Sequence, residues 1–213
     1  MDRGPEIAAL GETARAAFAE KHRAREITIA ASRQAIQACA ASIRSTHRGE
    51  YDAAETLARE ARDHVSAADA ALTGHGDVRT GGPLNDAKKE LAEAWLTLAL
   101  VRDAPLPTPD ELGIEIGPYC NGLAEAASEL RRQLLDQLRA GELARAETLM
   151  RAMDDICSLL VTIDYPDGVT GGLRRTTDAL RAVLERTRGD LTTTIVASRL
   201  QAAIESAQRA TEG

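Results

Sequence analysis

The segment GLAEAASEL, residues 122–130, predicts a helix with two different faces. Because an α-helix turns by about 100° per residue, one face carries a stripe of leucines that continues past the segment: Leu123, Leu130, Leu134 and Leu138. Glu125 and Glu129 lie off that stripe, beside Gly122 and Ala126. We expect the leucines to face the core, while the small neighbours let a second helix or a ligand approach the glutamates.

The segment KKELAEAW, residues 88–95, has the same arrangement earlier in the chain. Its apolar stripe consists of Leu84, Leu91, Trp95 and Leu98. Glu90 and Glu93 again lie off the stripe, among small residues. We therefore expect both pairs of glutamates to avoid the main core of the protomer. Lys89 stands where it can pair with Glu93 across one helical turn.

The composition predicts an all-α protein. The chain has 213 residues, of which 44% are hydrophobic, only 2% are aromatic and 7 are Pro, so the core must consist mainly of Leu, Ala, Ile and Val. The net charge of −7 and the pI of about 5.2 argue against a broadly basic nucleic-acid surface. A local basic patch is compatible with both values.

The cysteines and the apolar runs indicate the compartment. Cys39, Cys120 and Cys157 match neither a disulfide framework nor a zinc motif, which favours reduced thiols in a cytoplasmic protein. The N-terminus lacks the apolar region of a signal peptide. No run approaches the ~18 apolar residues of a transmembrane helix, so we expect no membrane partner.

Apolar periodicity and helix-breaking residues divide the chain into seven helices. They are expected at 5–47, 51–72, 84 to just before Pro105, a short helix opened by Thr108 and Pro109, 117–139, 142–163 and 173–208. The Gly-rich segments 73–83 and 164–172 are expected to be loops. Short connections favour antiparallel neighbours, so we expect residues 1–213 to form a single antiparallel helical domain.

The first and last helices are too long for a compact bundle of this size. A helix of forty residues is about 60 Å long. Helices that extend beyond their own core usually pack against another subunit. The sequence therefore predicts a homo-oligomer.

Two interpretations of the four glutamates remain open from the spacing alone. Glutamates three or four residues apart on a helix are usually solvated surface. Alternatively, four carboxylates form a site for Mg²⁺ or Mn²⁺, which take oxygen ligands. A di-iron site would require Glu-x-x-His spacing. None of the four histidines satisfies it: His22, His47, His64 and His75.

A basic stretch marks a candidate surface for nucleic acid. Between positions 21 and 48 there are six Lys or Arg residues and one acid. The candidates for contact with a phosphate backbone are Arg25, Arg33 and Arg44. A second arginine-rich segment, 172–188, also contains acids at helical spacing, which favours ion pairs within the protein. Because aromatic residues are few, we expect recognition of the backbone rather than of the bases.

Several segments resemble the translin superfamily in its single-chain prokaryotic form: REITIAASR (25–33), GLAEAASELRR (122–132), DDICSLLVTIDYPD (154–167) and GLRRTTDALRAVLERTRGDL (172–191). Translin-associated factor X (Trax) has the pattern Q-E-Y-V-E-A on one helix and G-V-A-D-x-x-x-E on another. KELAEA places Glu90 and Glu93 on the first pattern, and GLAEAASE places Glu125 and Glu129 on the second. Glu125 replaces an aspartate of the pattern, and Lys89 replaces a glutamine.

The resemblance implies a translin-like fold and a Mg²⁺-dependent endoribonuclease that cuts single-stranded RNA. The glutamates at positions 90, 93, 125 and 129 would then be both metal ligands and catalytic residues. The resemblance also implies a hollow, octameric shell with the acids facing inward. One alternative is a non-catalytic protein that binds single-stranded RNA or DNA, as translin does, and another is a helical scaffold that binds neither metal nor RNA.

Overall fold

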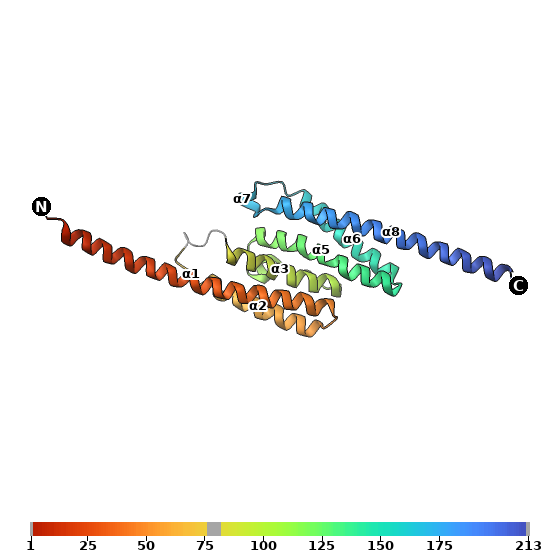
Figure 1. Ribbon diagram of the computed structural model, residues 1–213, viewed down its shortest axis with the longest axis horizontal. Helices are drawn as coiled ribbons and strands as arrows, with labels where there is room; N and C mark the ends of the chain where they lie inside the picture. Colours follow the sequence, from red (N-terminus) through yellow and green to blue (C-terminus); the bar gives the residue numbers. More distant parts are fainter. Residues whose placement is uncertain (1, 76–81, 212–213) are drawn as a thin grey trace.

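The structure is a computed structural model that describes residues 2–75 and 82–211 (Figure 1). Eight helices and no strand occur in these ranges. The helices are α1 Gly4–His47, α2 Tyr51–Ala71, α3 Pro83–Arg102, α4 Pro109–Leu112, α5 Ile116–Ala140, α6 Leu143–Val161, α7 Asp167–Thr170 and α8 Leu173–Thr211. Within the described ranges, no helix is both long and apolar enough to span a membrane.

The predicted all-α class and the long first and last helices are confirmed. The expected N-cap of α4 is present, because Thr108 Oγ1 accepts from the backbone of Glu111 and the Glu111 carboxylate accepts in return. The one additional element is α7, a single turn inside the segment that we expected to be a loop. It begins after Pro166 and ends before Gly171, whose φ of 64° suits glycine. The middle of the expected loop at 73–83 lies outside the described residues.

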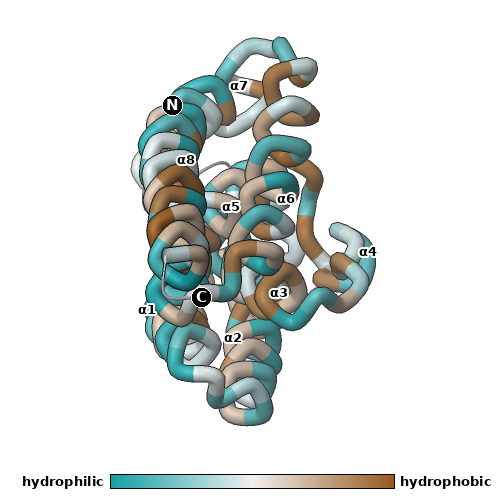
Figure 2. The backbone as a smooth tube through the Cα atoms, turned by 90° about the vertical axis from the view of Figure 1, so that its right-hand side faces the viewer, coloured by the Kyte–Doolittle hydropathy of each residue, from teal (hydrophilic) through white to brown (hydrophobic). Residues whose placement is uncertain are grey.

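Two helices in the middle of the bundle carry its core. α3 packs against α1, α2 and α5, whereas α5 packs against α3, α6 and α8. Figure 2 looks along the bundle and shows α5 surrounded by these neighbours. Because α3 has neighbours on several sides, residues all around its axis are buried, not only the predicted stripe.

The contact between α3 and α5 is unusually close at Gly122. A Cβ atom at this position would lie 2.6 Å from the Cβ of Ala92, 2.6 Å from the carbonyl oxygen of Lys89 and 2.9 Å from the backbone nitrogen of Glu93. Ala92 and Ala126 are fully buried beside it. Only a residue without a side chain fits, so the two helix backbones approach each other there.

Both long helices extend beyond the core, at opposite ends of the molecule (Figure 1). The first buried residue of α1 is Ala24. The last buried residue of α8 is Leu191. The overhanging parts expose large apolar side chains, which are Ile7, Leu10 and Phe18 on α1 and Val196, Leu200 and Ile204 on α8.

The contact at Gly122 predicts that Gly122→Ala lowers the free energy of unfolding by about 1–3 kcal/mol or more, because the methyl group forces α3 and α5 apart. The measurement is urea unfolding followed by circular dichroism. Gly189→Ala is the matched control, since a Cβ there would meet no atom within 4 Å. This control should gain roughly 0.5–1 kcal/mol. Equal stability of Gly122→Ala and the parent would contradict the proposed role of the contact.

Candidate metal centre

Three carboxylates from two helices meet beside this contact. Glu90 and Glu93 come from α3 and Glu125 comes from α5, and one oxygen atom of each lies within 4.8 Å of the others. Gly122 lies one turn before Glu125 and against the backbone of α3, so the same close approach that requires glycine brings the carboxylates together. Two like charges at such a distance repel by about 3–4 kcal/mol at an effective dielectric constant of 20. The group therefore requires positive charge.

Glu93 is the most buried member of the group. Its residue surface is 9% exposed, which corrects the expectation that the glutamates avoid the core. That expectation treated α3 as a one-sided helix, but α1, α2 and α5 cover several of its sides. Burial, followed by the charges of Glu90, Glu125 and Glu129, raises the pKa of Glu93 to about 9. This carboxyl group consequently holds a proton at neutral pH when no metal ion is bound.

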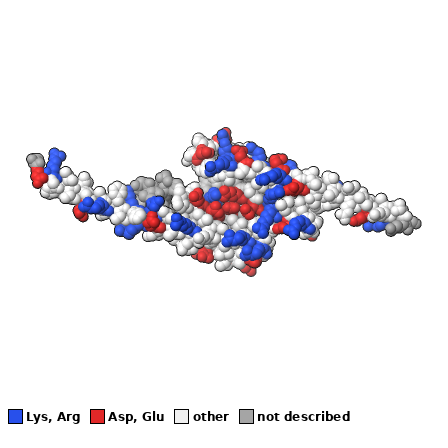
Figure 3. Space-filling model, viewed as in Figure 1, with Lys and Arg blue, Asp and Glu red and all other residues white. Residues whose placement is uncertain are grey.

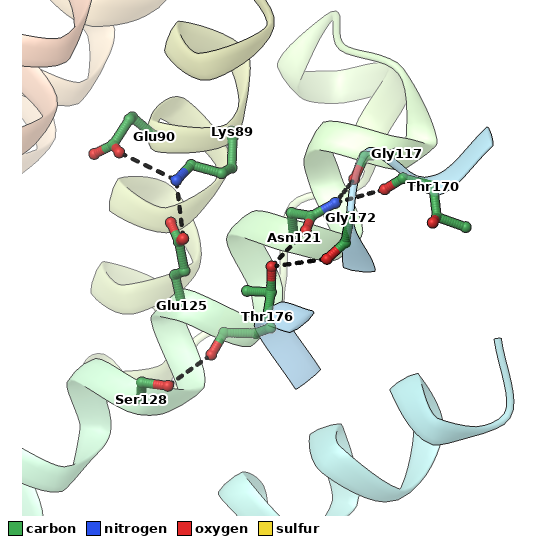
Figure 4. A network of polar contacts seen from close by, with 10 residues as sticks. Lys89, Glu90, Gly117, Asn121, Glu125, Ser128, Thr170, Gly172 and Thr176 are labelled. Atoms are coloured by element: carbon green, nitrogen blue, oxygen red, sulfur yellow. Dashed lines mark hydrogen bonds and ion pairs between the residues drawn. The ribbon is translucent and has the colours of Figure 1, made fainter. Parts of the chain in front are cut away.

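Lys89 places a cation against the other two carboxylates, as Figure 4 shows. Its Nζ donates to Glu125 Oε1 at 2.8 Å and lies 3.5 Å from Glu90 Oε1. Lys89 therefore pairs with Glu125 on the neighbouring helix α5, and not with Glu93, the partner expected from helical spacing. Burial lowers the pKa of Lys89, but the hydrogen bond and charge of Glu125 and the charge of Glu90 outweigh it, so that the pKa is raised.

The proton on Glu93 and the ammonium group of Lys89 together supply two positive charges. That is the charge of one divalent ion. Burial is also the main reason why the pKa of Glu90 is raised, with Lys89 opposing the shift. The proton and the ammonium group offset two of the three negative charges of the carboxylates, and a metal ion would replace them.

Glu129 lies next to this group but makes a different contact. Its Oε2 is hydrogen-bonded to Nε2 of His47, 2.6 Å away at the C-terminal end of α1. Glu129 does not belong to the three carboxylates within 4.8 Å, although its charge contributes to the raised pKa of Glu93. The structure therefore brings three of the four predicted residues into one group and places the fourth at its edge.

His47 was not among the site residues predicted from the sequence. Its side chain is only 2% exposed, and its Nδ1 has no hydrogen-bond partner among the described residues. The Glu-x-x-His spacing does not cover this contact, because His47 and Glu129 are 82 positions apart. No local pattern indicates a contact that depends on how α1 packs against the rest of the bundle.

A hollow of about 400 Å³ adjoins the carboxylates on one side. Lys89 and Glu125 form part of its wall together with Asp86 and Arg175. Asn121, which is buried at the same place, donates to the carbonyl oxygens of Gly117 and Thr170 and accepts from Thr176 (Figure 4). This network fastens α5 to α7 and α8 and so fixes the wall of the hollow.

The three carboxylates fit a hard divalent cation. Carboxylate oxygens are the ligands that Mg²⁺ and Mn²⁺ prefer, and no sulfur or imidazole atom belongs to the group. Cys39 lies on α1, and burial, followed by the charges of Glu90 and Glu93, raises the pKa of its thiol far above the usual value. This cysteine stays neutral and does not offer a thiolate ligand.

The three arginines that we selected for RNA contact lie on α1 and are exposed: Arg25, Arg33 and Arg44. Arg25 forms an exposed ion pair with Glu26, at 2.9 Å. Figure 3 shows acidic side chains gathered in the middle of one face, with Lys and Arg side chains around them. The face therefore has an anionic centre and a largely cationic surround.

No protein-family model matches this chain. The uncharacterized protein MJ0175 of Methanocaldococcus jannaschii is 31% identical over 180 residues, which are 84% of this chain and 79% of that protein.

Solved structures of C3PO proteins are also similar to this chain. AfC3PO in complex with duplex RNA superimposes with a TM-score of 0.81 at 28% identity, over 87% of this chain and 96% of that chain. A crystal structure of AfC3PO gives a TM-score of 0.79 at 28% identity, over 87% and 97% of the two chains. Apo-NeC3PO gives 0.76 over 91% and 100%, but at 17% identity it supports the fold alone.

The raised pKa of Glu93 predicts how stability depends on pH. The native state holds this proton more tightly than the unfolded chain does, so its stabilising contribution is complete below about pH 4.5 and is lost as pH rises towards 9. Glu93→Gln imitates the protonated form. In metal-free buffer near pH 8 it should exceed the parent in free energy of unfolding by about 1–4 kcal/mol. The difference should vanish near pH 4.

Unfolding in urea at several pH values, with a chelator present, measures this difference. Glu147→Gln is the control, because Glu147 is an exposed glutamate of α6. It should show no such pH-dependent gap. A Glu93→Gln variant that is less stable than the parent at pH 8 would show that Glu93 is ionised in the native state.

Proposed function

Because this chain belongs to the translin superfamily as a Trax-like member, we propose that it is a metal-dependent endoribonuclease that cuts single-stranded RNA. The observation that carries the proposal is the group of three carboxylates, Glu90, Glu93 and Glu125, within 4.8 Å of one another. AfC3PO has been solved with duplex RNA, which supports RNA as the ligand and makes duplex RNA the second substrate to test.

The three grouped carboxylates would hold one Mg²⁺ or Mn²⁺ ion. When bound, such an ion generates a nucleophile from water at neutral pH and neutralises the charge that develops on phosphate oxygens. The protein contributes the position of the ligands. α3 and α5 are fixed against each other by the contact at Gly122, so the ligands need little reorganisation when the ion arrives.

Glu129 and His47 are suited to handle a proton at the edge of this group. Imidazole and carboxylate joined by a 2.6 Å hydrogen bond form a pair in which a proton can shift between Nε2 and Oε2. The burial of His47 fixes the orientation of Glu129. We infer that Glu129 positions the attacking water and that His47 positions Glu129.

The exposed arginines of α1 would hold the phosphate backbone. Arg33 and Arg44 are three turns apart and can share one face of the helix. The arginines of α8 are less suitable, because Arg174 pairs with Asp164 and Arg188 pairs with Asp154. We therefore place RNA contact on the first long helix.

We also propose that the protein works as a closed homo-oligomer, an octamer in the form that the family resemblance implies. The overhanging ends of α1 and α8 support self-association, since both expose apolar side chains to solvent. Large exposed apolar surfaces of this kind usually mark an interface. In such a shell the carboxylates would face the enclosed space.

A second function, binding of RNA without cleavage, is favoured by one observation. Lys89 occupies the space between Glu90 and Glu125 and competes there with a metal ion. If the ion never displaces Lys89, the protein would retain RNA but leave it intact.

Cleavage of labelled RNA distinguishes the two functions. We expect the parent to cut single-stranded RNA in Mg²⁺ or Mn²⁺ and to lose activity in a chelator. Glu125→Gln and Glu90→Gln should lose about 100-fold or more in rate, because each removes a charged ligand. Both should keep RNA affinity, measured by fluorescence anisotropy.

Glu147→Gln again serves as the matched control and should cut like the parent. Retention of RNA with no cleavage in either metal would establish the binding function instead. Cleavage by Glu125→Gln and Glu90→Gln at the parent rate would exclude the metal centre from the reaction. The same assay on duplex RNA decides which substrate is preferred.

The arginines predict a salt-dependent interaction. Arg33→Ala and Arg44→Ala should each weaken RNA binding for all sequences alike and reduce the slope of log K against log salt by about 1. Arg139→Ala is the control, since Arg139 is an exposed arginine of α5 that pairs with Asp136. Unchanged salt slopes in both α1 variants would place the RNA elsewhere.

A further inference from the structure

Lys89 is the one cation that contacts two members of the carboxylate group in the part of the chain that the structure describes. Its Nζ is 2.8 Å from Glu125 and 3.5 Å from Glu90. It therefore bridges α3 and α5, and the ammonium group lies between ligands that belong to different helices (Figure 4).

A metal ion held by Glu90, Glu93 and Glu125 would need the same carboxylates. The positive charge of Lys89 would repel a metal ion in this space and weaken its attraction to the carboxylates. Lys89 is covalently attached to the chain, so it is always present at high local concentration. A metal ion that binds all three ligands therefore competes with Lys89 for Glu90 and Glu125.

The surroundings of Lys89 allow such a displacement. The side chain is 26% exposed, and it forms part of the wall of the adjoining hollow of about 400 Å³. Asp86 lies in the same wall and offers another anion to the ammonium group. A lysine side chain has several rotatable bonds, so the ammonium group can turn into the hollow without moving the helices.

We propose that Lys89 is a built-in competitor of the divalent ion: it holds α3 and α5 together when the site is metal-free and sets the concentration of metal needed to fill it. This inference rests on the proposed metal centre. It assigns to Lys89 a role in setting the metal concentration at which the site fills, which a passive salt bridge does not have, because a passive bridge would only add stability.

The competitor role predicts that removing the charge of Lys89 changes stability and metal affinity in opposite directions. Removing the charge of Lys89 should destabilise the metal-free protein, since Glu90 and Glu125 lose their counter-ion. The same change should strengthen metal binding, since the competitor is gone. A bridge that merely positions the carboxylates would, when removed, weaken both properties.

The test is a titration with Mn²⁺ alone at fixed pH and ionic strength, followed by calorimetry and by electron paramagnetic resonance of the free ion. We expect Lys89→Gln to bind Mn²⁺ about tenfold or more tightly than the parent, as expected for the loss of a charged hydrogen bond. In metal-free buffer it should melt at a lower temperature. Lys89→Arg keeps the charge and should bind Mn²⁺ like the parent.

Arg131→Gln is the matched control. Arg131 is 29% exposed and its Nη2 lies 2.7 Å from Asp190, so it resembles Lys89 in exposure and pairing, but its partner is outside the carboxylate group. This variant should melt at a lower temperature with no change in Mn²⁺ affinity. Lys89→Met, which keeps an apolar stem of similar length, replaces Lys89→Gln if the latter fails to fold.

The outcomes separate this inference from the proposed function. Equal or weaker Mn²⁺ binding by Lys89→Gln and Lys89→Met, with binding by the parent intact, overturns the competitor role but leaves the metal centre standing. Binding by these variants and not by the parent supports the competitor role strongly. If no variant and no parent protein binds Mn²⁺, the metal centre itself is wrong and this inference fails with it.

Discussion

The close approach of α3 and α5 at Gly122 is the constraint on which the rest of the structure depends. No side chain fits between the two backbones there, and the small residues Ala92 and Ala126 complete the contact. One consequence is a dense core in which α3 and α5 each pack against several helices. The other is electrostatic, because the same contact forces carboxylates from both helices into one small volume. The contact at Gly122 therefore explains both the packing of the core and the grouping of the carboxylates.

Bringing these carboxylates together is unfavourable for folding unless positive charge compensates. The protein uses two compensations of different kinds, a proton on the most buried carboxyl and an ammonium group on the more accessible pair. Neither is fixed, since a proton exchanges with solvent and a lysine side chain can rotate. Because both compensating groups can leave, the carboxylates can bind a cation without refolding of the helices. The ion pair of Arg131 with Asp190, by contrast, does not involve any of the three grouped carboxylates.

Much of the fold could be predicted from the sequence, because helix boundaries depend on local signals such as Pro109, Gly141 and the apolar periodicity. The prediction from the resemblance and two helical wheels was one group of four glutamates, and the structure brings three of them together, Glu90, Glu93 and Glu125. The wheels did not predict the burial of Glu93. A wheel describes one helix, whereas burial depends on how many neighbours that helix has. The contact of His47 with Glu129 and the turn of Lys89 towards Glu125 were missed for the same reason. All three depend on packing between segments distant in sequence.

The overhanging ends of α1 and α8 are not alike. Buried positions of α1 recur every seven residues, and Ile7, Leu10 and Phe18 continue that pattern beyond the core. On α8, Val196, Leu200 and Ile204 lie on the side turned away from its buried positions. A contact between these two ends in neighbouring copies is heterologous, so a pair of copies would keep one unused α1 end and one unused α8 end. Such a head-to-tail chain stops growing only when its rotation per step closes a ring, and otherwise it continues as a filament.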